Sequence, residues 1–213
     1  MTLRLSLQRH PDTSCPPLTG IEVELARVRP MKLALRYVLL GAAHNIRMKP
    51  PAGSSDPLWM HTCFEAFIRV AGEEEYLEIN LAPTGDWTAW RFRQYRDGME
   101  AVRGLEASVL GSSQRRKPMD RAERARLREA GFDTLERFEP SFYSLQMEVT
   151  LDPAMSLFLD RPWRLGLSAV IEENNGRISY WALAHPPGKP DFHHPDCFGL
   201  ELPAAKPGPS PRT

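Results

Sequence analysis

The stretch TCFEAFIRVAGEEEYLEINLAPTGDWTAWRF, residues 62–92, decides the fold. Residues 62–70 and 75–81 are apolar-rich runs with strand character, and the short Gly/Glu segment between them predicts a hairpin. Residues 82–87 (APTGDW) are typical of a turn, because proline fixes φ and glycine accepts positive φ. Residues 87–95 then predict a strand that runs back. The whole stretch therefore indicates an antiparallel meander.

Further strands are predicted on both sides of this meander, and residues 172–176 (EENNG) favour a hairpin turn through their Asn-Gly pair. About ten strands joined in this way predict an all-β fold, an antiparallel immunoglobulin-like or jelly-roll-type β-sandwich. We expect one domain over residues 1–202. The additional strands are predicted at residues 2–7, 21–25, 31–40, 142–151, 163–171, 177–183 and 197–202.

Two segments depart from the strand pattern. Residues 112–138 are highly charged, and 119–130 predict one short helical insertion between Asp120 and Gly131. This insert is either a solvated addition to the sandwich or a protein-interaction helix, and its interleaved Arg and Glu favour the first. The Pro-rich tail at 203–213 is predicted to be disordered.

Charge and hydropathy exclude several function classes. The 27 Lys and Arg balance the 27 Asp and Glu, which argues against nucleic acid or an anionic membrane as partner. No apolar run approaches the roughly 18 residues of a membrane span, and the N-terminus MTLRLSLQRHP lacks the pattern of a signal peptide. We therefore expect a soluble, cytoplasmic protein. Its three cysteines are expected to be free thiols, with a Cys63–Cys197 disulfide as the alternative.

Catalytic motifs are absent from the sequence. There is no G-x-S-x-G elbow and no glycine-rich phosphate loop, so we predict no catalytic residues. Glu65 and Glu78 lie on neighbouring predicted strands and could form the carboxylate pair of a glycosidase. Exposed glutamates on a sheet are the alternative.

The histidine pattern argues against a metal site. His193 and His194 are adjacent and would point to opposite faces of an extended segment, and prolines separate them from the neighbouring His185. We predict no metal site and no cofactor. A haem-binding or redox module, with ligands from Met60, His61 and His185, stays as an alternative.

Aromatic residues gather at strand ends and turns, which is typical of a ligand-binding face. Trp87 and Trp90 must face opposite sides of their strand. Trp90 shares a side with Phe92 and is the expected core residue, so Trp87 is the expected ligand residue. The wider aromatic set is Trp59, Trp87, Trp90, Tyr180, Trp181 and Phe192.

Four motifs in order resemble the DOMON-like group, which is related to the family 9 carbohydrate-binding modules. They are LWMHTCFEAFIR (58–69), YLEINLAPTGDWTAWRF (76–92), YRDGM (95–99) and ISYWALAHPPGKPDFHHPDCFG (178–199). The resemblance covers most of residues 1–202. It implies a sandwich with a pocket on one side, related domains that bind sugars or haem, and a soluble bacterial protein.

The resemblance also implies the ligand-binding residues. In the first two motifs they are Trp59, Glu65, Asn80 and Trp87, with Gly85 at the turn. In the last motif they are Trp181, Lys189, Asp191 and His193. The expected function is non-catalytic binding of a small molecule, a saccharide or a cell-wall-like compound.

The prolines of residues 184–195 predict a rigid extended lip beside the pocket. Lys189, Asp191 and His193 alternate along it and could project to one side. An internal Lys189–Asp191 salt bridge that pins the loop is the structural alternative.

Overall fold

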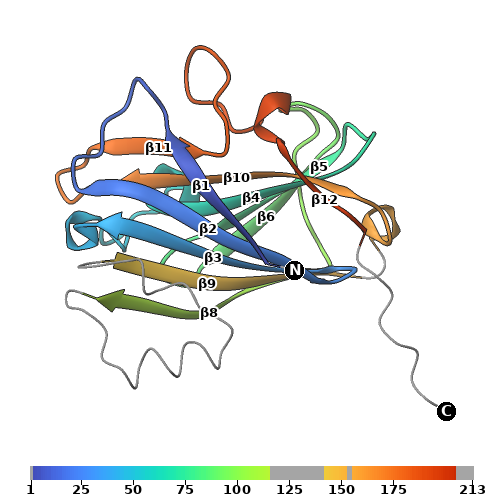
Figure 1. The fold of residues 1–213 in the computed structure, drawn as a ribbon, viewed down its shortest axis with the longest axis horizontal. Helices are drawn as coiled ribbons and strands as arrows, with labels where there is room; N and C mark the ends of the chain where they lie inside the picture. Colours follow the sequence, from blue (N-terminus) through green and yellow to red (C-terminus); the bar gives the residue numbers. More distant parts are fainter. Residues whose placement is uncertain (1, 116–141, 153–154, 205–213) are drawn as a thin grey trace.

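The structure is a computed structural model in which residues 2–115, 142–152 and 155–204 are described. This part of the chain forms twelve strands and four short 3-10 helices (Figure 1). The strands are β1 (Leu3–Arg9), β2 (Leu18–Arg29), β3 (Lys32–Gly41), β4 (Cys63–Val70), β5 (Tyr76–Leu81), β6 (Trp87–Phe92), β7 (Glu100–Ala101), β8 (Leu105–Arg115), β9 (Phe142–Leu151), β10 (Trp163–Glu172), β11 (Ile178–Ala182) and β12 (Leu200–Leu202). The 3-10 helices are η1 (Ala43–Asn45), η2 (Leu58–Met60), η4 (Ser156–Phe158) and η5 (Pro195–Cys197).

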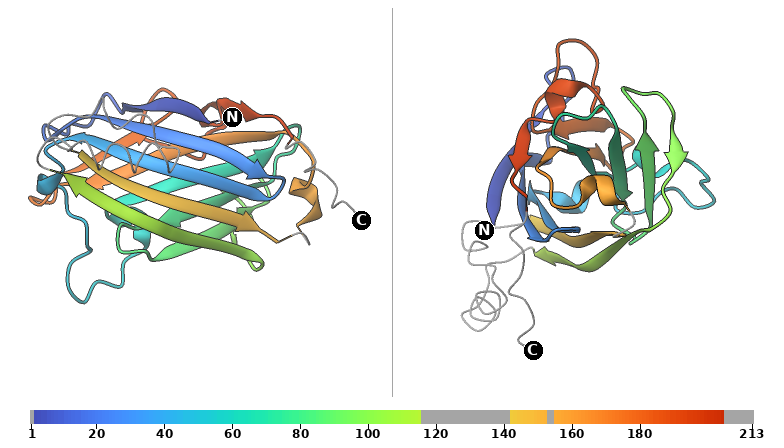
Figure 2. Two further views of the ribbon diagram at one scale, coloured as in Figure 1. Left: turned by 60° about the horizontal axis from the view of Figure 1, so that its bottom comes forward. Right: turned by 90° about the vertical axis from the view of Figure 1, so that its right-hand side faces the viewer.

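Every strand pairing is antiparallel, and the pairings form two layers that share β1. One layer has the order β1-β2-β3-β9-β8, and the other has the order β7-β6-β5-β4-β10-β11-β1, with β12 beside β10. Leu3–Leu7 of β1 pair with β2, whereas Gln8 and Arg9 pair with β11. Figure 2 shows the two layers facing one another, with β1 on the side where they join. The predicted all-β sandwich is confirmed.

The meander of residues 62–92 is confirmed with a continuous register. Phe64 of β4 lies opposite Leu81 of β5, and Ile79 lies opposite Ala89 of β6. The turn after β5 closes through a bond from the Gly85 N–H to the Ala82 carbonyl, and Gly85 has φ +96°. Glycine at this position avoids the strain that a Cβ would bring.

The core fills the space between the layers, because side chains alternate along a strand and every second one points into this space. A single cluster of buried apolar side chains runs from Leu7 to Leu202 and includes Phe64, Trp163 and Trp181. The predicted β10–β11 hairpin is confirmed, and its register sets Trp181 opposite Ala169. The three cysteines are buried free thiols, as expected.

Arg27 fastens β2 to the neighbouring loops at one end of the sandwich. Its guanidinium lies 3.6 Å from the centroid of the Trp163 ring. It also donates hydrogen bonds to the carbonyls of Pro30, Phe158 and Arg161 at 2.7–3.2 Å. The planar fork of arginine allows stacking and several hydrogen bonds at once.

Several boundaries differ from the sequence expectation, and three of them change the description of an element. Leu105–Arg115 form β8, so the prediction that the charged insert starts at residue 112 is wrong. Pairing with β9 makes residues 111–115 a strand in spite of their Ser- and Gly-rich sequence. β6 ends at Phe92, because residues 93–97 turn and Arg96 has φ +54°. The last strand begins at Leu200, after η5. The predicted helix at 119–130 and most of the 203–213 tail lie outside the described residues.

Candidate functional site

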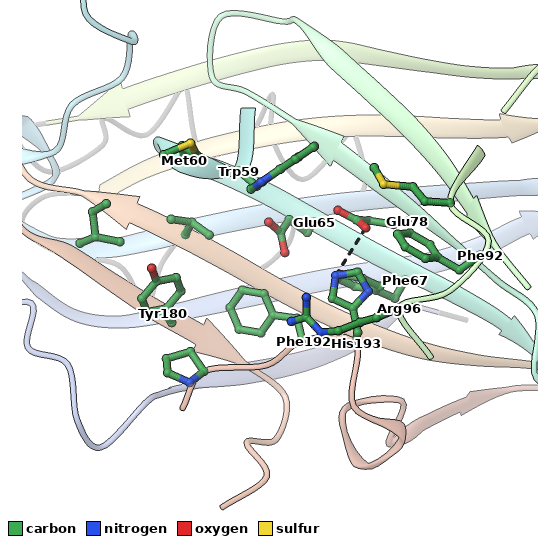
Figure 3. A pocket seen from close by; sticks show the side chains of 14 residues that line it. Trp59, Met60, Glu65, Phe67, Glu78, Phe92, Arg96, Tyr180, Phe192 and His193 are labelled. Carbon is green, nitrogen blue, oxygen red and sulfur yellow. Dashed lines mark ion pairs between the residues drawn. The ribbon is translucent and has the colours of Figure 1, made fainter. Parts of the chain in front are cut away.

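A cavity of about 460 Å³ lies on the outer face of the layer that contains β4, β5 and β10. The loop at η2, the loop after β6 and the proline-rich segment before η5 cover it. Figure 3 shows the side chains converging from these elements. The lining comprises Trp59, Met60, Glu65, Phe67, Glu78, Phe92, Arg96, Met99, Val170, Ile178, Tyr180, Pro190, Phe192 and His193.

The strand register explains which side chains form the cavity floor. Because faces alternate, Phe64 and Ala66 enter the core while Glu65 and Phe67 point outward. Glu65 lies opposite Asn80, and Phe67 lies opposite Glu78. Glu65 is 3% exposed and Glu78 is 5% exposed, although both are on the outer face of the sheet. The covering loops therefore hold two carboxylates out of bulk water.

Each of the two carboxylates has one well-formed side-chain hydrogen bond. Ser168 Oγ donates to Glu65 Oε2 at 2.8 Å, and Asn80 Nδ2 donates to Glu78 Oε1 at 2.7 Å. Burial, and then the nearby charge of Glu78, raises the pKa of Glu65 to about 8. Burial also raises the pKa of Glu78, against the opposing effects of the Asn80 hydrogen bond and the Arg96 charge. The pair consequently holds a proton at neutral pH.

His193 is fixed beside this pair as a neutral imidazole. Its Nδ1 lies 2.8 Å from the Tyr76 hydroxyl, which accepts a bond from the Arg96 backbone N–H at 3.2 Å. Its Nε2 lies 3.7 Å from Glu78 Oε2, so the tautomer with the proton on Nε2 is favoured. Burial, and then the Arg96 charge, lowers the pKa of His193 to about 4.

Asp191 anchors the covering lip. Its carboxylate accepts hydrogen bonds from the Tyr95 hydroxyl and, at 2.8 Å, from Arg96 Nη2. Burial alone would raise the pKa of Asp191, but these two bonds and the Arg96 charge outweigh it and lower the pKa. The partner of Asp191 is therefore Arg96 rather than the Lys189 of the alternative salt bridge, and Lys189 is exposed. Through these bonds, the predicted lip, which is the segment before η5, is joined to the loop after β6.

Aromatic side chains form the walls. Trp59 meets Trp90 edge to face at 6.3 Å between ring centroids, and Trp90 packs partly buried on the outer-face cluster with Phe92 instead of in the main core that was expected for it. Tyr180 and Phe192 pack edge to face at 6.0 Å. In Figure 3, Trp59 lies on one side of the two carboxylates, and Phe192 lies on the other.

The structure brings together part of the residue set that the sequence predicted. Trp59, Glu65 and His193 line the cavity, and Asn80 and Asp191 contact residues that line it. The ligand role of each stays a prediction.

Three predicted residues lie elsewhere. Trp181 is a core residue whose indole N–H bonds Ser179, because β11 turns this side chain inward. Trp87 is 37% exposed and lies on the opposite face of β6 from Phe92. Lys189 is at the exposed part of the lip. Their side chains do not line the described cavity.

The histidines proposed for haem are occupied by other contacts. His61 Nδ1 lies 2.8 Å from Glu172 Oε2, and His185 Nε2 lies 2.8 Å from the Gln8 carbonyl. Within residues 2–115, 142–152 and 155–204, no group of three or more His, Cys, Asp or Glu side chains is placed to hold a metal ion. Nor does that part of the chain contain a helix long and apolar enough to cross a membrane.

Sequence reasoning assigned no role to Arg96, Phe67 or Met99. Arg96 and Met99 fall within the YRDGM motif, which is one of the four motifs of the resemblance. The motif was noted, but none of its residues was predicted to bind a ligand. Phe67 was hidden in an apolar run, where only the register reveals which face it takes.

The fold and cavity define an all-β sandwich with a loop-covered cavity on one outer face. No protein-family model matches the chain, and no curated protein matches it significantly. Among solved structures, the crystal structure of a candidate carbohydrate-binding protein from Bacteroides uniformis is similar, with a TM-score of 0.55 and 14% identity. The match covers 93% of this chain and 84% of that one. At this identity the likeness shows that the two chains share a fold.

Proposed function

We propose that this chain is a DOMON-like, non-catalytic binding protein for a saccharide, held in the cavity floored by Glu65 and Glu78. The observation that carries the proposal is the combination of aromatic walls with buried, convergent polar groups. Ligand sites of this kind use apolar walls for contact area and a few fixed polar groups for orientation. A pyranose ring offers both an apolar face and a rim of hydroxyl groups.

The polar groups are held in place before any ligand arrives. Arg96 is fixed by Asp191, His193 is fixed by Tyr76, and Glu65 is fixed by Ser168. A preorganised site loses less conformational entropy on binding. Carboxylate oxygens accept hydrogen bonds from hydroxyls, while the guanidinium donates them.

Two further observations support the proposal. The similar structure from Bacteroides uniformis is that of a candidate carbohydrate-binding protein. The four motifs that resemble the DOMON-like group also supply the cavity residues Trp59, Glu65, Glu78, Arg96 and His193.

The test is isothermal titration calorimetry of the protein with a panel of neutral and charged mono- and disaccharides. We expect Trp59→Ala to abolish binding, because the indole forms one wall. Trp87→Ala is the matched control, since that indole is outside the cavity, and it should bind like the wild type. Thermal melts check that both variants fold. No binding across the panel, or normal binding by Trp59→Ala, would overturn the proposal.

A glycosidase also needs two carboxylates in one cavity. The proposal that the protein is non-catalytic therefore requires an assay of its own. Hydrolysis of aryl glycosides is measured with the wild type and with Glu78→Gln. We expect no turnover by either protein. Turnover that Glu78→Gln removes would make the chain an enzyme, and a Soret band after haem addition would instead favour the haem alternative.

A further inference from the structure

We infer that the cavity selects a saccharide that carries a free amino group, with its ammonium placed between Glu65 and Glu78. The inference rests on the proposed saccharide-binding function and names the chemical class of ligand. Three features of the described structure support it: the absence of a Lys or Arg ion pair to either carboxylate, the ion pair of the neighbouring Arg96 with Asp191, and the aromatic walls.

Neither carboxylate has a cationic partner among the described residues. Glu65 receives a hydrogen bond at Oε2 from the neutral Ser168 hydroxyl, and the described groups donate none to its Oε1. Glu78 receives a bond at Oε1 from the neutral Asn80 amide, and its Oε2 faces the neutral imidazole of His193 at 3.7 Å. Glu65 Oε1 thus has no donor among the described side chains, and Glu78 Oε2 faces only the His193 Nε2 group, at a distance beyond an ordinary hydrogen bond.

The two carboxylates face the same space. Glu65 and Glu78 are diagonal neighbours on adjacent strands, and such side chains begin about 7–8 Å apart. Figure 3 shows both carboxylates in the middle of the cavity, between Trp59 and the Arg96–His193 side. An ammonium has three donors, so one group can bond both carboxylates.

The charged group beside the pair is Arg96, whose charge lowers the pKa of Glu78 against the effect of burial. Arg96 lines the cavity, but its guanidinium is paired with Asp191. Tyr76 on β5, Tyr37 on β3 and Cys63 on β4 have pKa values raised by burial, so they are neutral at neutral pH. His193 is neutral as well. An anionic ligand would therefore meet two acidic groups, whereas a cation would neutralise them.

The aromatic walls favour a cation too. Trp59, Phe92 and Phe192 line the same cavity, and the faces of aromatic rings attract ammonium groups when water is excluded. A neutral hydroxyl at the same position would form hydrogen bonds without this attraction and without the charge assistance that strengthens bonds to carboxylates.

Proton release should accompany cation binding. With a pKa of about 8, Glu65 is almost fully protonated at pH 6.5 in the free protein. An ammonium between the carboxylates favours their ionised forms, so binding should release about one proton into the buffer. A neutral sugar gives no reason for this release.

The experiment compares glucosamine, glucose and N-acetylglucosamine by calorimetry at pH 6.5 in two buffers with different ionisation enthalpies. We expect glucosamine to bind at least tenfold more tightly than the other two and to release about one proton. Glu78→Gln should remove the preference, and Glu65→Gln should remove the proton release. Glu201→Gln, at an exposed position outside the cavity, should change neither.

The outcomes separate the two proposals. If glucose or N-acetylglucosamine binds as tightly as glucosamine, the inference is overturned while saccharide binding stands. The same conclusion follows if glucosamine binds without releasing a proton. If no saccharide of the wider panel binds, the proposed function itself fails. The wild-type comparison decides the matter even if a variant does not fold.

Discussion

Replacing Glu65 with glutamine should make the protein more stable at pH 8 and change it little at pH 5. The pKa of Glu65 is raised from its ordinary value of 4.5 to about 8 in the folded protein. The folded state therefore binds this proton more tightly than the unfolded state does. The contribution of Glu65 to stability is fully present below pH 4.5 and falls as the pH rises from 4.5 to 8, because only the unfolded chain ionises the group freely over that range.

The magnitude follows from the difference between the two pKa values. One pKa unit corresponds to about 1.4 kcal/mol, so the wild type should lose about 4 kcal/mol between low pH and pH 8 through this group. At pH 5 the loss should be below about 1 kcal/mol. A glutamine has nearly the same shape and does not ionise, and its amide oxygen still accepts the hydrogen bond from Ser168.

Urea denaturation at pH 5, 7 and 8 measures the effect. We expect the free energy of unfolding of Glu65→Gln to exceed that of the wild type by an amount that grows with pH to about 4 kcal/mol. Glu201→Gln controls for the loss of one surface charge. A stability difference that stays constant from pH 5 to pH 8, or a variant less stable than the wild type at pH 8, would refute the reasoning.

Three further substitutions test other contacts. Tyr76→Phe removes the hydroxyl that holds His193, so it should lower the free energy of unfolding by about 1–3 kcal/mol in urea melts; an unchanged midpoint would contradict this. Arg27→Lys cannot keep both the stacking on Trp163 and the set of carbonyl bonds, and it should cost roughly 2 kcal/mol by the same assay. Trp181→Ala should cost about 3–5 kcal/mol, measured by thermal melts; a small loss of stability joined to lost saccharide binding would return this residue to the ligand set.

Local sequence signals were enough to predict the strands and hairpins. Alternation in residues 62–92 and the Asn-Gly pair before β11 depend only on neighbours in the chain, and both hairpins are present. β8 was not predicted although residues 105–109 alternate, and its Gly- and Ser-rich end is a strand through its pairing with β9.

The site was predictable only in part, because its remaining features depend on distant segments. Glu78 was recognised as a possible partner of Glu65, but its burial comes from loops far along the chain. Arg96 is defined by its contact with Asp191, 95 positions away. Trp181 stands at a strand end in the sequence, and only the register of β10 and β11 shows that it faces the core.

The split pairing of β1 means that one short segment shields two hydrogen-bonding edges. Its first part covers the edge of β2, and its last two residues cover the edge of β11. Strand edges left open are templates for pairing with other molecules. Removal of residues 1–9 would thus expose an edge in each layer at once, and self-association would be its first sign. β1 is in this sense a guard against aggregation for both layers of the sandwich.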